Sequence, residues 1–395
     1  MNTELLKSKL LEAAFNGSLT HADTRTWEET TMGDVFTHNT GKALKKDNTE
    51  GVLRPYITTS NLYWDRFDMD VVKQMYFKES ELEKFTIRKG DLLICEGGDI
   101  GRSAIWDFDY EICFQNHVHR LRPRREANVR FYYYIMLYYK WTNRIKGRGI
   151  GLEGFSSGVL DKLEVPYPPI AEQQRIVAAL EEGFAYIDAV AGAKQNLSNT
   201  AELLRSKILQ AAFDGSLTGA DTSTWEDVKL REVTTKIVDG DHNPPKGEED
   251  PTPYIMLSSQ NINDDTYVAM NKVRYLSKEN FDMCNKRTHL TKGDVLLTSV
   301  GTIGRSCVHN SDEVYCFQRS VTIITPTINS YFLKYYFDSP AFQQMLNMSS
   351  TGNAQKGFYL NKLKEVLIPL PSPEEQQRIV SKIEELFTQI DKITK

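Results

Sequence analysis

The chain has 395 residues, 40% of them hydrophobic, and a formal net charge of -5 at pH 7. This length favours two to three folded domains, and no apolar run approaches the roughly twenty residues that a membrane span needs. The mild acidity argues against a protein coated with basic residues but leaves room for a local basic cleft. The five cysteines form no CxxC pair and no leader precedes the first expected helix, so we expect a protein of the reducing cytoplasm.

The chain opens with a segment that is repeated near its middle. Residues Leu5 to Glu28 match Leu203 to Glu226 at 18 of 24 positions. The hexapeptide EQQRIV also occurs twice, at Glu172 to Val177 and at Glu375 to Val380. The chain is therefore predicted to be two copies of one unit, with one joint whole in the middle and the other divided between the termini.

A first domain follows the N-terminal helix expected over Glu4 to Phe15 and runs from Trp27 to about Pro168. Short β-like runs broken by glycines indicate strands, and a helix is expected over Asn128 to Lys146. The expected strands are Val52–Thr59, Asp91–Glu96, Ser103–Trp106 and Ile112–Leu121.

A long helix is expected in the middle, over Ala171 to Leu217, because its apolar residues recur three, four or seven positions apart. Asp214 with Gly215 is a typical helix stop. Unbroken, such a helix would span roughly 60 Å, although Gly183 and Gly192 are points where it could bend or break.

The apolar seam of this helix needs a partner. Ser372, Pro373 and Glu375 are typical of a helix start, so a C-terminal helix is expected from Pro373. Together with the N-terminal helix it is predicted to pack antiparallel to the middle helix as a coiled coil, which would relate the halves by an approximate twofold axis.

The second domain, from Trp225 to Pro371, repeats the plan of the first. Arg88 to Trp106 is answered by Thr291 to His309, and Cys113-Phe114-Gln115 by Cys316-Phe317-Gln318. The predicted fold class is α/β (α+β), with two similar domains joined by long helices. The predicted division is an N-terminal helix (1–20), a first domain (25–168), a central helical spacer (170–217), a second domain (223–371) and a C-terminal helix (373–395).

Several linked features resemble the DNA specificity subunit of type I restriction-modification systems. They are the tandem arrangement, the EQQRIV starts of two long helices, the GxIGRS segment after a GD-hydrophobic strand, and GNAQKGFYLNKLKEVLIPLP at Gly352 to Pro371. The resemblance implies that each half is a target recognition domain reading one part of a split DNA sequence. It also implies that the long helices dock two methyltransferase (modification) subunits, to which restriction subunits are added. The first copy lacks the counterpart of Gln355.

Two motifs invite a catalytic or nucleotide-binding interpretation. Asn243-Pro244-Pro245 is like the loop with which adenine N6-methyltransferases grip a flipped base, but Lys246 replaces the stacking aromatic, and no cofactor fingerprint precedes it. This loop is therefore either merely stiffened by proline or points polar side chains at DNA. The GGDIGRS and VGTIGRS segments lack the phosphate-loop lysine, which favours tight strand connections, although Arg102 or Arg305 could contact a DNA phosphate.

Basic residues are concentrated between Arg120 and Arg148, where nine Lys or Arg accompany a single acid, Glu126. Such asymmetry is typical of a face that follows phosphates, or alternatively of a solvated helix face. The aromatics within it, Phe131 to Tyr134, Tyr138, Tyr139 and Trp141, are expected to form core.

Candidate DNA-reading residues are those that pair donors and acceptors with base edges and fall on expected loops, together with basic residues near phosphates. In the first domain they are Asn61, Arg102, Asn116, His117, His119, Arg120 and Arg148. In the second they are Asp241, His242, Asn243, Lys246, Gln260, Asn261, Arg305, Gln318 and Arg319. No metal-ligand spacing and no nuclease or motor motif is present.

The sequence thus predicts a non-catalytic subunit without a cofactor of its own that reads a bipartite target in double-stranded DNA. S-adenosylmethionine is expected on the partner methyltransferase. The alternative is a tandem-domain scaffold that binds two copies of a protein without DNA contact, which the acidic net charge favours. A third interpretation, an enzyme fused to its own recognition domains, lacks the expected cofactor and nuclease signatures.

Overall fold

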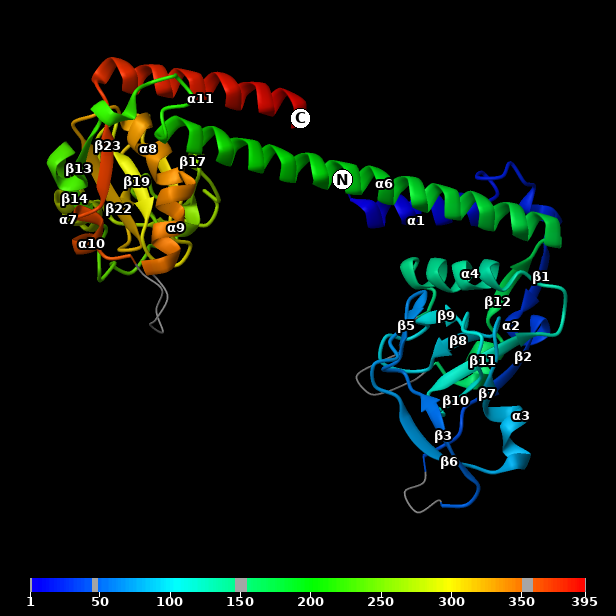
Figure 1. The fold of residues 1–395 in the computed structure, drawn as a ribbon. Helices are drawn as coiled ribbons and strands as arrows, with labels where there is room; N and C mark the ends of the chain where they lie inside the picture. The colour runs from blue at the N-terminus through cyan, green and yellow to red at the C-terminus, as the bar shows by residue number, and fades with distance from the viewer. Residues whose placement is uncertain (1, 45–48, 146–154, 350–357, 395) are drawn as a thin grey trace. The chain divides into compact units, whose positions relative to one another are not determined.

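The computed structural model describes residues 2–44, 49–145, 155–349 and 358–394. The chain divides into two compact units, residues 1–194 and 195–395. Figure 1 shows both with their elements labelled. Each unit is a mixed α/β structure, as predicted.

The first unit contains two four-stranded sheets, with strand orders β2-β11-β8-β9 and β6-β3-β10-β7. The first sheet is antiparallel, whereas β3 and β10 of the second are parallel. Its elements are α1 (Thr3–Phe15), η1 (Thr24–Thr26), β1 (Glu28–Thr31), α2 (Met32–Val35), β2 (Phe36–Thr40), β3 (Val52–Ile57), β4 (Leu62–Tyr63), β5 (Arg66–Phe67), β6 (Lys73–Phe77), η2 (Glu79–Glu81), α3 (Leu82–Phe85), β7 (Thr86–Ile87), β8 (Leu92–Cys95), β9 (Ser103–Ile105), β10 (Ile112–Phe114), β11 (Val118–Pro123), α4 (Val129–Trp141), α5 (Ser157–Asp161) and β12 (Glu164–Tyr167).

The second unit repeats this plan, with sheets β14-β22-β19-β20 and β18-β15-β21 and a ribbon β13-β23 that matches β1-β12. Its elements are η3 (Thr222–Thr224), β13 (Glu226–Lys229), η4 (Leu230–Val233), β14 (Thr234–Asp239), β15 (Ile255–Leu257), η5 (Ser259–Asn261), β16 (Ile262–Asn263), β17 (Thr266–Tyr267), β18 (Arg274–Tyr275), α7 (Lys278–Thr288), β19 (Val295–Thr298), β20 (Ser306–Val308), β21 (Cys316–Phe317), β22 (Val321–Pro326), α8 (Ser330–Asp338), α9 (Pro340–Ser349), α10 (Leu360–Lys364), β23 (Leu367–Leu370) and α11 (Pro373–Thr394).

Two sequence-based expectations for the first unit need correction. The strand expected over Ile112–Leu121 is two strands, β10 and β11, because a turn closed by the Val118 N–H and the Gln115 carbonyl redirects the chain into the other sheet. The helix expected to reach Lys146 ends at Trp141 and is followed by Asn143 in the left-handed region, with φ of 57°.

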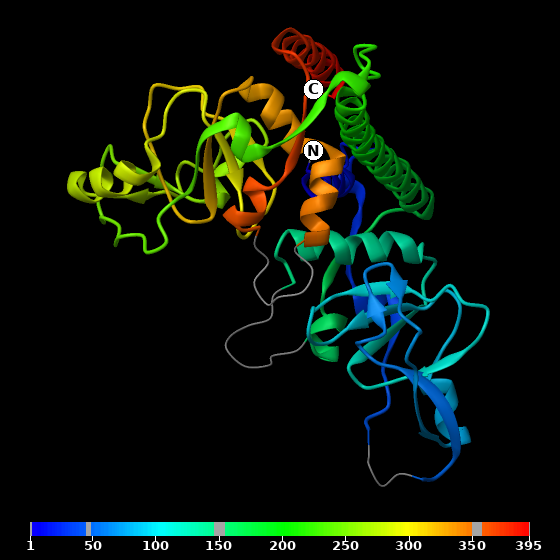
Figure 2. The ribbon, with the colours of Figure 1, turned by 60° about the vertical axis from the view of Figure 1, so that its left-hand side comes forward.

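The aromatic residues of the first turns of α4 are core, as predicted, but the same expectation for Trp141 is wrong, because this last residue of the helix is 38% exposed. Phe131, Tyr132, Tyr133 and Tyr134 are all buried, and they pack with residues of α1 and of the long helix α6 (Ile170–Phe213). Figure 2 shows α4, in teal, lying over the strands of the first unit. In the second unit, buried Phe332, Leu333 and Phe337 of α8 fill the equivalent place.

The long middle helix is present as α6, and it is not broken at Gly183 or Gly192. It stops before Asp214, and Gly215 adopts the left-handed conformation expected of a helix stop. Gly183 has a packing role, because a Cβ there would lie 2.3 Å from the Leu10 side chain of α1.

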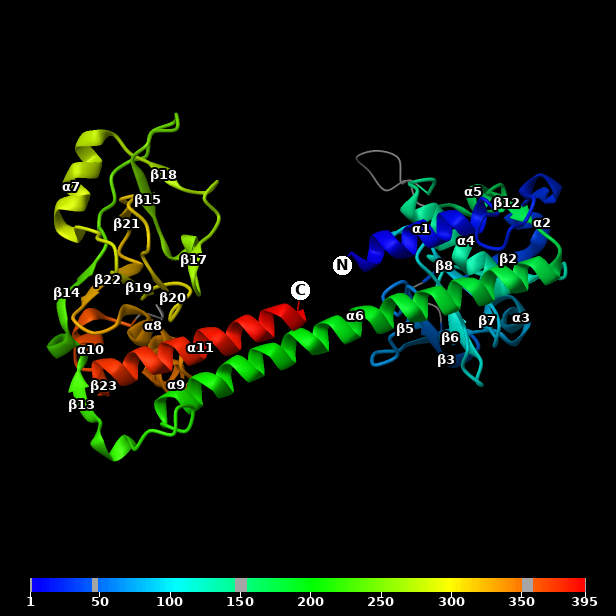
Figure 3. The same ribbon diagram turned by 90° about the horizontal axis from the view of Figure 1, so that it is seen from above.

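In Figure 3, α1 lies along one end of α6 and α11 along the other. Equivalent side-chain contacts hold both helix pairs. In the first unit, Lys7 of α1 pairs with Asp188 of α6 at 2.7 Å, and Thr20 donates to Glu172 at 2.5 Å. In the second unit, Arg205 of α6 pairs with Asp391 of α11, and Thr218 donates to Glu375. The order of these contacts along the chain shows that the paired helices run antiparallel within each unit. The twofold relation between the units stays a prediction.

Candidate nucleic-acid interface

Four loops of the first unit converge at one end of its strands, and we call them the first loop cluster. It comprises residues 41–43 after β2, 58–61 after β3, 96–102 between β8 and β9, and the turn 115–118. Backbone hydrogen bonds tie them together: Lys42 donates to Phe114, Gln115 to Ile57, Asn116 to Lys42, and Glu96 to His117.

The second unit builds the second loop cluster in the same way, from residues 240–246, 258–261, 299–305 and the turn 318–321. The corresponding hydrogen bonds run from Asp241 to Phe317, from Gln318 to Leu257, from Arg319 to Asp241, and from Ser299 to Ser320. One backbone frame therefore serves both units.

Glycine is required at the same point of both frames. A Cβ on Gly41 would lie 2.3 Å from the Gln115 carbonyl oxygen, and a Cβ on Gly240 would lie 2.3 Å from the Gln318 carbonyl oxygen. These contacts are with backbone, which cannot step aside as a flexible side chain can. The close approach therefore explains the glycine that precedes Lys42 and Asp241.

The second loop cluster gathers most of the predicted DNA-reading residues. Asp241, His242, Asn243, Lys246, Gln260, Gln318 and Arg319 all lie on its loops. His242, Asn243, Lys246, Gln260 and Arg319 are exposed, and Asp241 and Gln318 are half-buried. Gln260 and Gln318 also line a small cavity of about 220 Å³, which Lys272 and Arg274 complete.

Asp241 shapes the loop that follows it. Its carboxylate accepts the Asn243 N–H at 2.8 Å and faces the Cys284 thiol at 3.4 Å. Nearby, burial raises the pKa of Asp239, whose carboxylate accepts from Thr322 and lies 3.7 Å from the His242 ring. The loop from 241 to 246 is thus anchored at its base while His242, Asn243 and Lys246 remain exposed.

The first loop cluster exposes fewer of its candidates. His117 is exposed with its ring 3.2 Å from Glu96, and Asn116 is half-buried. Arg102 is half-buried, donates to the Thr59 carbonyl at 2.6 Å and stacks on Tyr63. Arg102 therefore ties two loops of the cluster together. Its counterpart Arg305 is also half-buried.

Asn61 and Asn261, two of the candidates expected on loops, do lie in turns, but both side chains are buried. Each side-chain oxygen accepts the backbone N–H three residues earlier, from Thr58 or Ser258, and each side-chain nitrogen donates to backbone carbonyls of the following loop. They hold turns together, and the exposed positions of these turns are Ser60 and Gln260.

His119 and Arg120 are not loop residues, because both are buried on strand β11. His119 lies between the His38 ring at 2.9 Å and the Phe155 carbonyl at 2.9 Å, and His38 continues to Asp161 at 2.7 Å. Arg120 donates to backbone carbonyls and to Asn39. Arg148, and also Gln355, lie outside the described residues.

The basic run after Arg120 is largely neutralised within the first unit. Its cations pair with carboxylates: Arg122 with Asp91, Arg124 with Asp34, Arg125 with Glu28, Arg130 with Asp65 and Glu181, and Lys140 with Asp99. Arg144 instead stacks on Tyr138 and Tyr139. The described part of this run is therefore not a free phosphate-following face.

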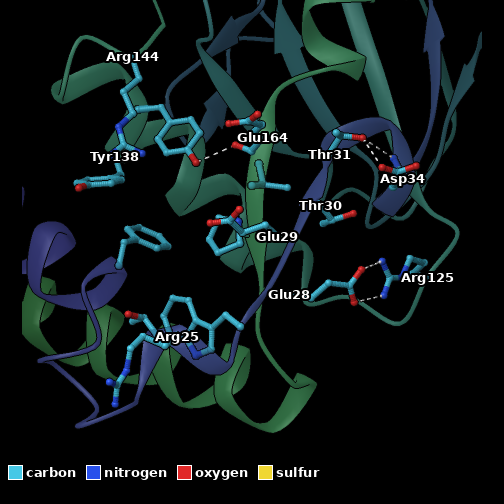
Figure 4. A pocket seen from close by; sticks show the side chains of 16 residues that line it. Arg25, Glu28, Glu29, Thr30, Thr31, Asp34, Arg125, Tyr138, Arg144 and Glu164 are labelled. Atoms are coloured by element: carbon cyan, nitrogen blue, oxygen red, sulfur yellow. Dashed lines mark hydrogen bonds and ion pairs between the residues drawn. The ribbon is translucent and has the colours of Figure 1, made fainter.

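A larger cavity, of about 1080 Å³, lies in the first unit between the β1-β12 ribbon and the end of α4 (Figure 4). Its walls bond mainly to one another: Arg125 to Glu28, Thr31 to Asp34, and the Tyr139 hydroxyl to the Glu164 carbonyl. None of its lining residues belongs to the first loop cluster.

Sequence reasoning missed two glutamines, one in each unit, that fix the α/β part of the unit to its long helix. Gln173 donates to the Pro168 carbonyl and accepts from the Asn128 N–H, and Gln376 repeats both bonds with Pro371 and Asn329. Both side chains are buried. Their place in the duplicated EQQRIV hexapeptide was a signal that could have identified them.

The described residues show no sign of metal, thiol or membrane chemistry. They contain no group of three or more His, Cys, Asp or Glu placed to hold a metal ion. Burial raises the pKa of the Cys95 thiol, and that of Cys307 to about 12, so these thiols stay protonated. No helix in this part of the chain combines the length and apolar character that crossing a bilayer requires.

Comparison with known proteins gives two matches to one family profile, the type I restriction modification DNA specificity domain, at residues 24–199 and 222–395. The chain belongs to this specificity-domain family. Family membership accounts for the duplicated frame, because each unit contains one copy of the domain.

Characterised relatives extend over nearly the full chain. The chain is 27% identical to the type I restriction enzyme EcoBI specificity subunit of Escherichia coli over 425 aligned positions, covering all of this chain and 86% of the relative. It is 23% identical to the EcoKI specificity subunit of Escherichia coli strain K12, covering 93% and 84%.

Solved structures agree on the fold. A chain from a structural study of assembly and conformational transition of the type I R-M system superposes with a TM-score of 0.67 at 21% identity, covering 93% of this chain and 92% of that one. The HsdS subunit from Thermoanaerobacter tengcongensis gives a TM-score of 0.58 at 21% identity, with 92% and 90% covered.

Proposed function

We propose that this specificity-domain protein is the non-catalytic DNA-reading subunit of a cytoplasmic type I restriction-modification complex. Each unit reads one part of a bipartite target through its loop cluster. The observation that carries the proposal is the duplicated backbone frame of a DNA specificity domain, which presents different exposed side chains in its two copies. The two half-sites should therefore be unrelated in sequence.

The second loop cluster has the chemistry that base reading needs. Amide, imidazole and guanidinium groups are exposed together at Asn243, His242 and Arg319, and such groups pair with base edges in the major groove. Lys246 adds an exposed cation suited to a phosphate contact.

The helix joints are suited to docking the other subunits. Leu5 and Leu6 of α1 are 52% and 39% exposed, and their repeats Leu203 and Leu204 of α6 are 56% and 45% exposed. Exposed leucines at the same positions of both copies favour two equivalent partners, namely two methyltransferase subunits. S-adenosylmethionine would bind to those subunits, and restriction subunits would join the same complex.

The proposal is tested by mixing the purified chain with its methyltransferase subunit and titrating duplex DNA at several salt concentrations. Sequence-dependent binding that weakens as salt rises supports it. A complex that assembles two methyltransferase subunits but does not bind DNA would instead favour the alternative of a protein-binding scaffold.

The spacer role of α6 is tested by inserting one heptad between Lys194 and Thr200. If this helix sets the separation of the half-sites, the unread gap in the methylated sequence should lengthen, because a heptad adds roughly 10 Å of helix. An unchanged gap would contradict the spacer role while leaving base reading by the loops intact.

A further inference from the structure

The turn between the two sheets has the same backbone hydrogen bonds in both loop clusters. In each unit it begins with the Gln of a Phe-Gln pair and is closed by an N–H to carbonyl bond of 3.0 Å, from Val118 to Gln115 and from Val321 to Gln318. The second residue of each turn donates its N–H to the loop after β2 or β14, and the third accepts an N–H from the loop after β8 or β19. The turn is thus held on both sides.

The side chains on this fixed turn differ between the units. The second position is Asn116 in the first unit and Arg319 in the second. Among the described residues, neither the Asn116 amide nor the Arg319 guanidinium has a hydrogen-bond or ion-pair partner, and Arg319 is exposed.

Three other arginines near the clusters differ from Arg319 in this respect, whereas the guanidinium of Arg305, also without a partner among the described residues, is half-buried and not exposed. Arg102 is committed to the Thr59 carbonyl and Arg120 to internal carbonyls and Asn39. In the second unit, Arg274 donates to the Pro245 carbonyl. A rigid backbone combined with an uncommitted planar donor suits recognition that needs two parallel hydrogen bonds.

We propose that this turn is a specificity-determining position, at which Arg319 reads a guanine and Asn116 reads an adenine. Guanine offers O6 and N7 as acceptors to the guanidinium fork, and adenine offers N7 and N6 to a carboxamide. The inference rests on the proposed function, since it names the bases that the two loop clusters recognise.

The test uses the complex of the full chain with its methyltransferase subunit, and it starts by mapping the methylated motif of the wild type with long-read sequencing. Variants Arg319→Asn, Arg319→Lys and Asn116→Arg are then compared on duplexes in which each motif position is changed in turn. Lys292→Gln is the matched control, because Lys292 is an exposed cation before β19, at the opposite end of that strand from residues 299–305.

Both Arg319 variants are expected to lose roughly five- to hundredfold of the discrimination at one guanine of one half-site, with the other half-site unaffected. Lysine keeps the charge but loses the paired donors, so it should fail as asparagine does. Asn116→Arg should shift preference from adenine towards guanine in the opposite half-site. The control should match the wild type.

Three results would overturn the inference. The first is a motif without guanine in the half-site of the second unit, and the second is unchanged base discrimination in Arg319→Asn. The third is that Arg319→Asn binds every sequence more weakly to the same extent while Arg319→Lys binds as the wild type does, which is the behaviour of a phosphate contact. If thermal unfolding shows that Arg319→Asn does not fold, Arg319→Lys decides alone. Failure of the proposed function is separate, because the wild-type complex itself would then show no sequence preference.

Discussion

The two loop clusters share a backbone but use their polar residues differently. In the first unit, Lys42 is held by Glu81 at 2.5 Å and by the Tyr76 carbonyl at 3.0 Å, and His119 and Arg120 are buried in internal contacts. In the second unit, the residue equivalent to Lys42 is Asp241, which anchors a loop of exposed polar residues. The backbone frame is therefore the same in both units, and the internal bonds of individual side chains decide which polar groups each loop cluster exposes.

Exchanging residues 223–371 for the corresponding domain of another specificity subunit should have the largest effect on the methylated sequence. If each unit reads alone, one half of the methylated sequence should be replaced entirely and the other half retained. Long-read mapping of methylation in cells that express the hybrid would measure this. Changes in both halves would mean that the units do not read independently.

Substituting the frame glycine should have the next largest effect. Gly41→Ala places a Cβ against the Gln115 carbonyl oxygen, and overpacking of this kind costs about 1–3 kcal/mol of the free energy of unfolding. Gly97→Ala is the control in the same cluster, because a Cβ there meets nothing within 4 Å. Urea denaturation measures the free energy of unfolding of both variants. Equal values would contradict the close approach of Gly41 to the Gln115 carbonyl.

The buried histidine pair predicts a pH response of the first unit. Burial, together with the nearby His38, lowers the pKa of His119 from 6.5 to about 4. Between these pH values His119 is therefore protonated in the unfolded chain and neutral in the folded chain. The stability that depends on neutral His119 is complete above about pH 6.5 and is lost as pH falls towards 4, in total about 3 kcal/mol.

This response is measured as the difference between the wild type and His119→Thr, which installs the Thr322 of the second unit. Denaturation midpoints between pH 7 and pH 4 should converge as pH falls, because the variant lacks the titrating group. Parallel curves for the two proteins would show that His119 is not the group responsible.

The ion pairs of the helix joints should matter least. Lys7→Met removes the pair with Asp188, whose carboxyl side chain is 60% exposed, and exposed pairs contribute less than about 1 kcal/mol. Arg205→Met should cost more, because the Arg205 guanidinium lies 4.3 Å from the centre of the Phe387 ring, whereas Lys7 lies 5.3 Å from that of the Phe184 ring. Thermal unfolding of the two variants tests this order, and a larger loss for Lys7→Met would reverse it.

The sequence predicted the features that repeat or follow a period. The duplication predicted two similar α/β units, apolar spacing predicted α6, and the helix-start residues Ser372, Pro373 and Glu375 predicted α11. The aromatic run of α4 was correctly placed in the core except for Trp141. These features depend on local patterns that a single sequence displays.

The misplaced site residues depend on contacts that are distant along the chain. Asn61 looks like any polar loop residue until its bonds to Asp68 and Val71 are known. Arg120 looks free until β11 is found between β2 and β8, with Asn39 and Thr86 beside it. Polarity shows that a side chain needs partners but does not show whether those partners are protein or DNA.

We propose that this chain supplies sequence preference through two different readers built on one frame. It is tested most directly by expressing the chain with its methyltransferase subunit in cells that lack other methylation and mapping every methylated adenine. We predict a bipartite motif with two unrelated half-sites and an unread gap. Methylation that is independent of the chain, or a motif without a gap, would contradict the account.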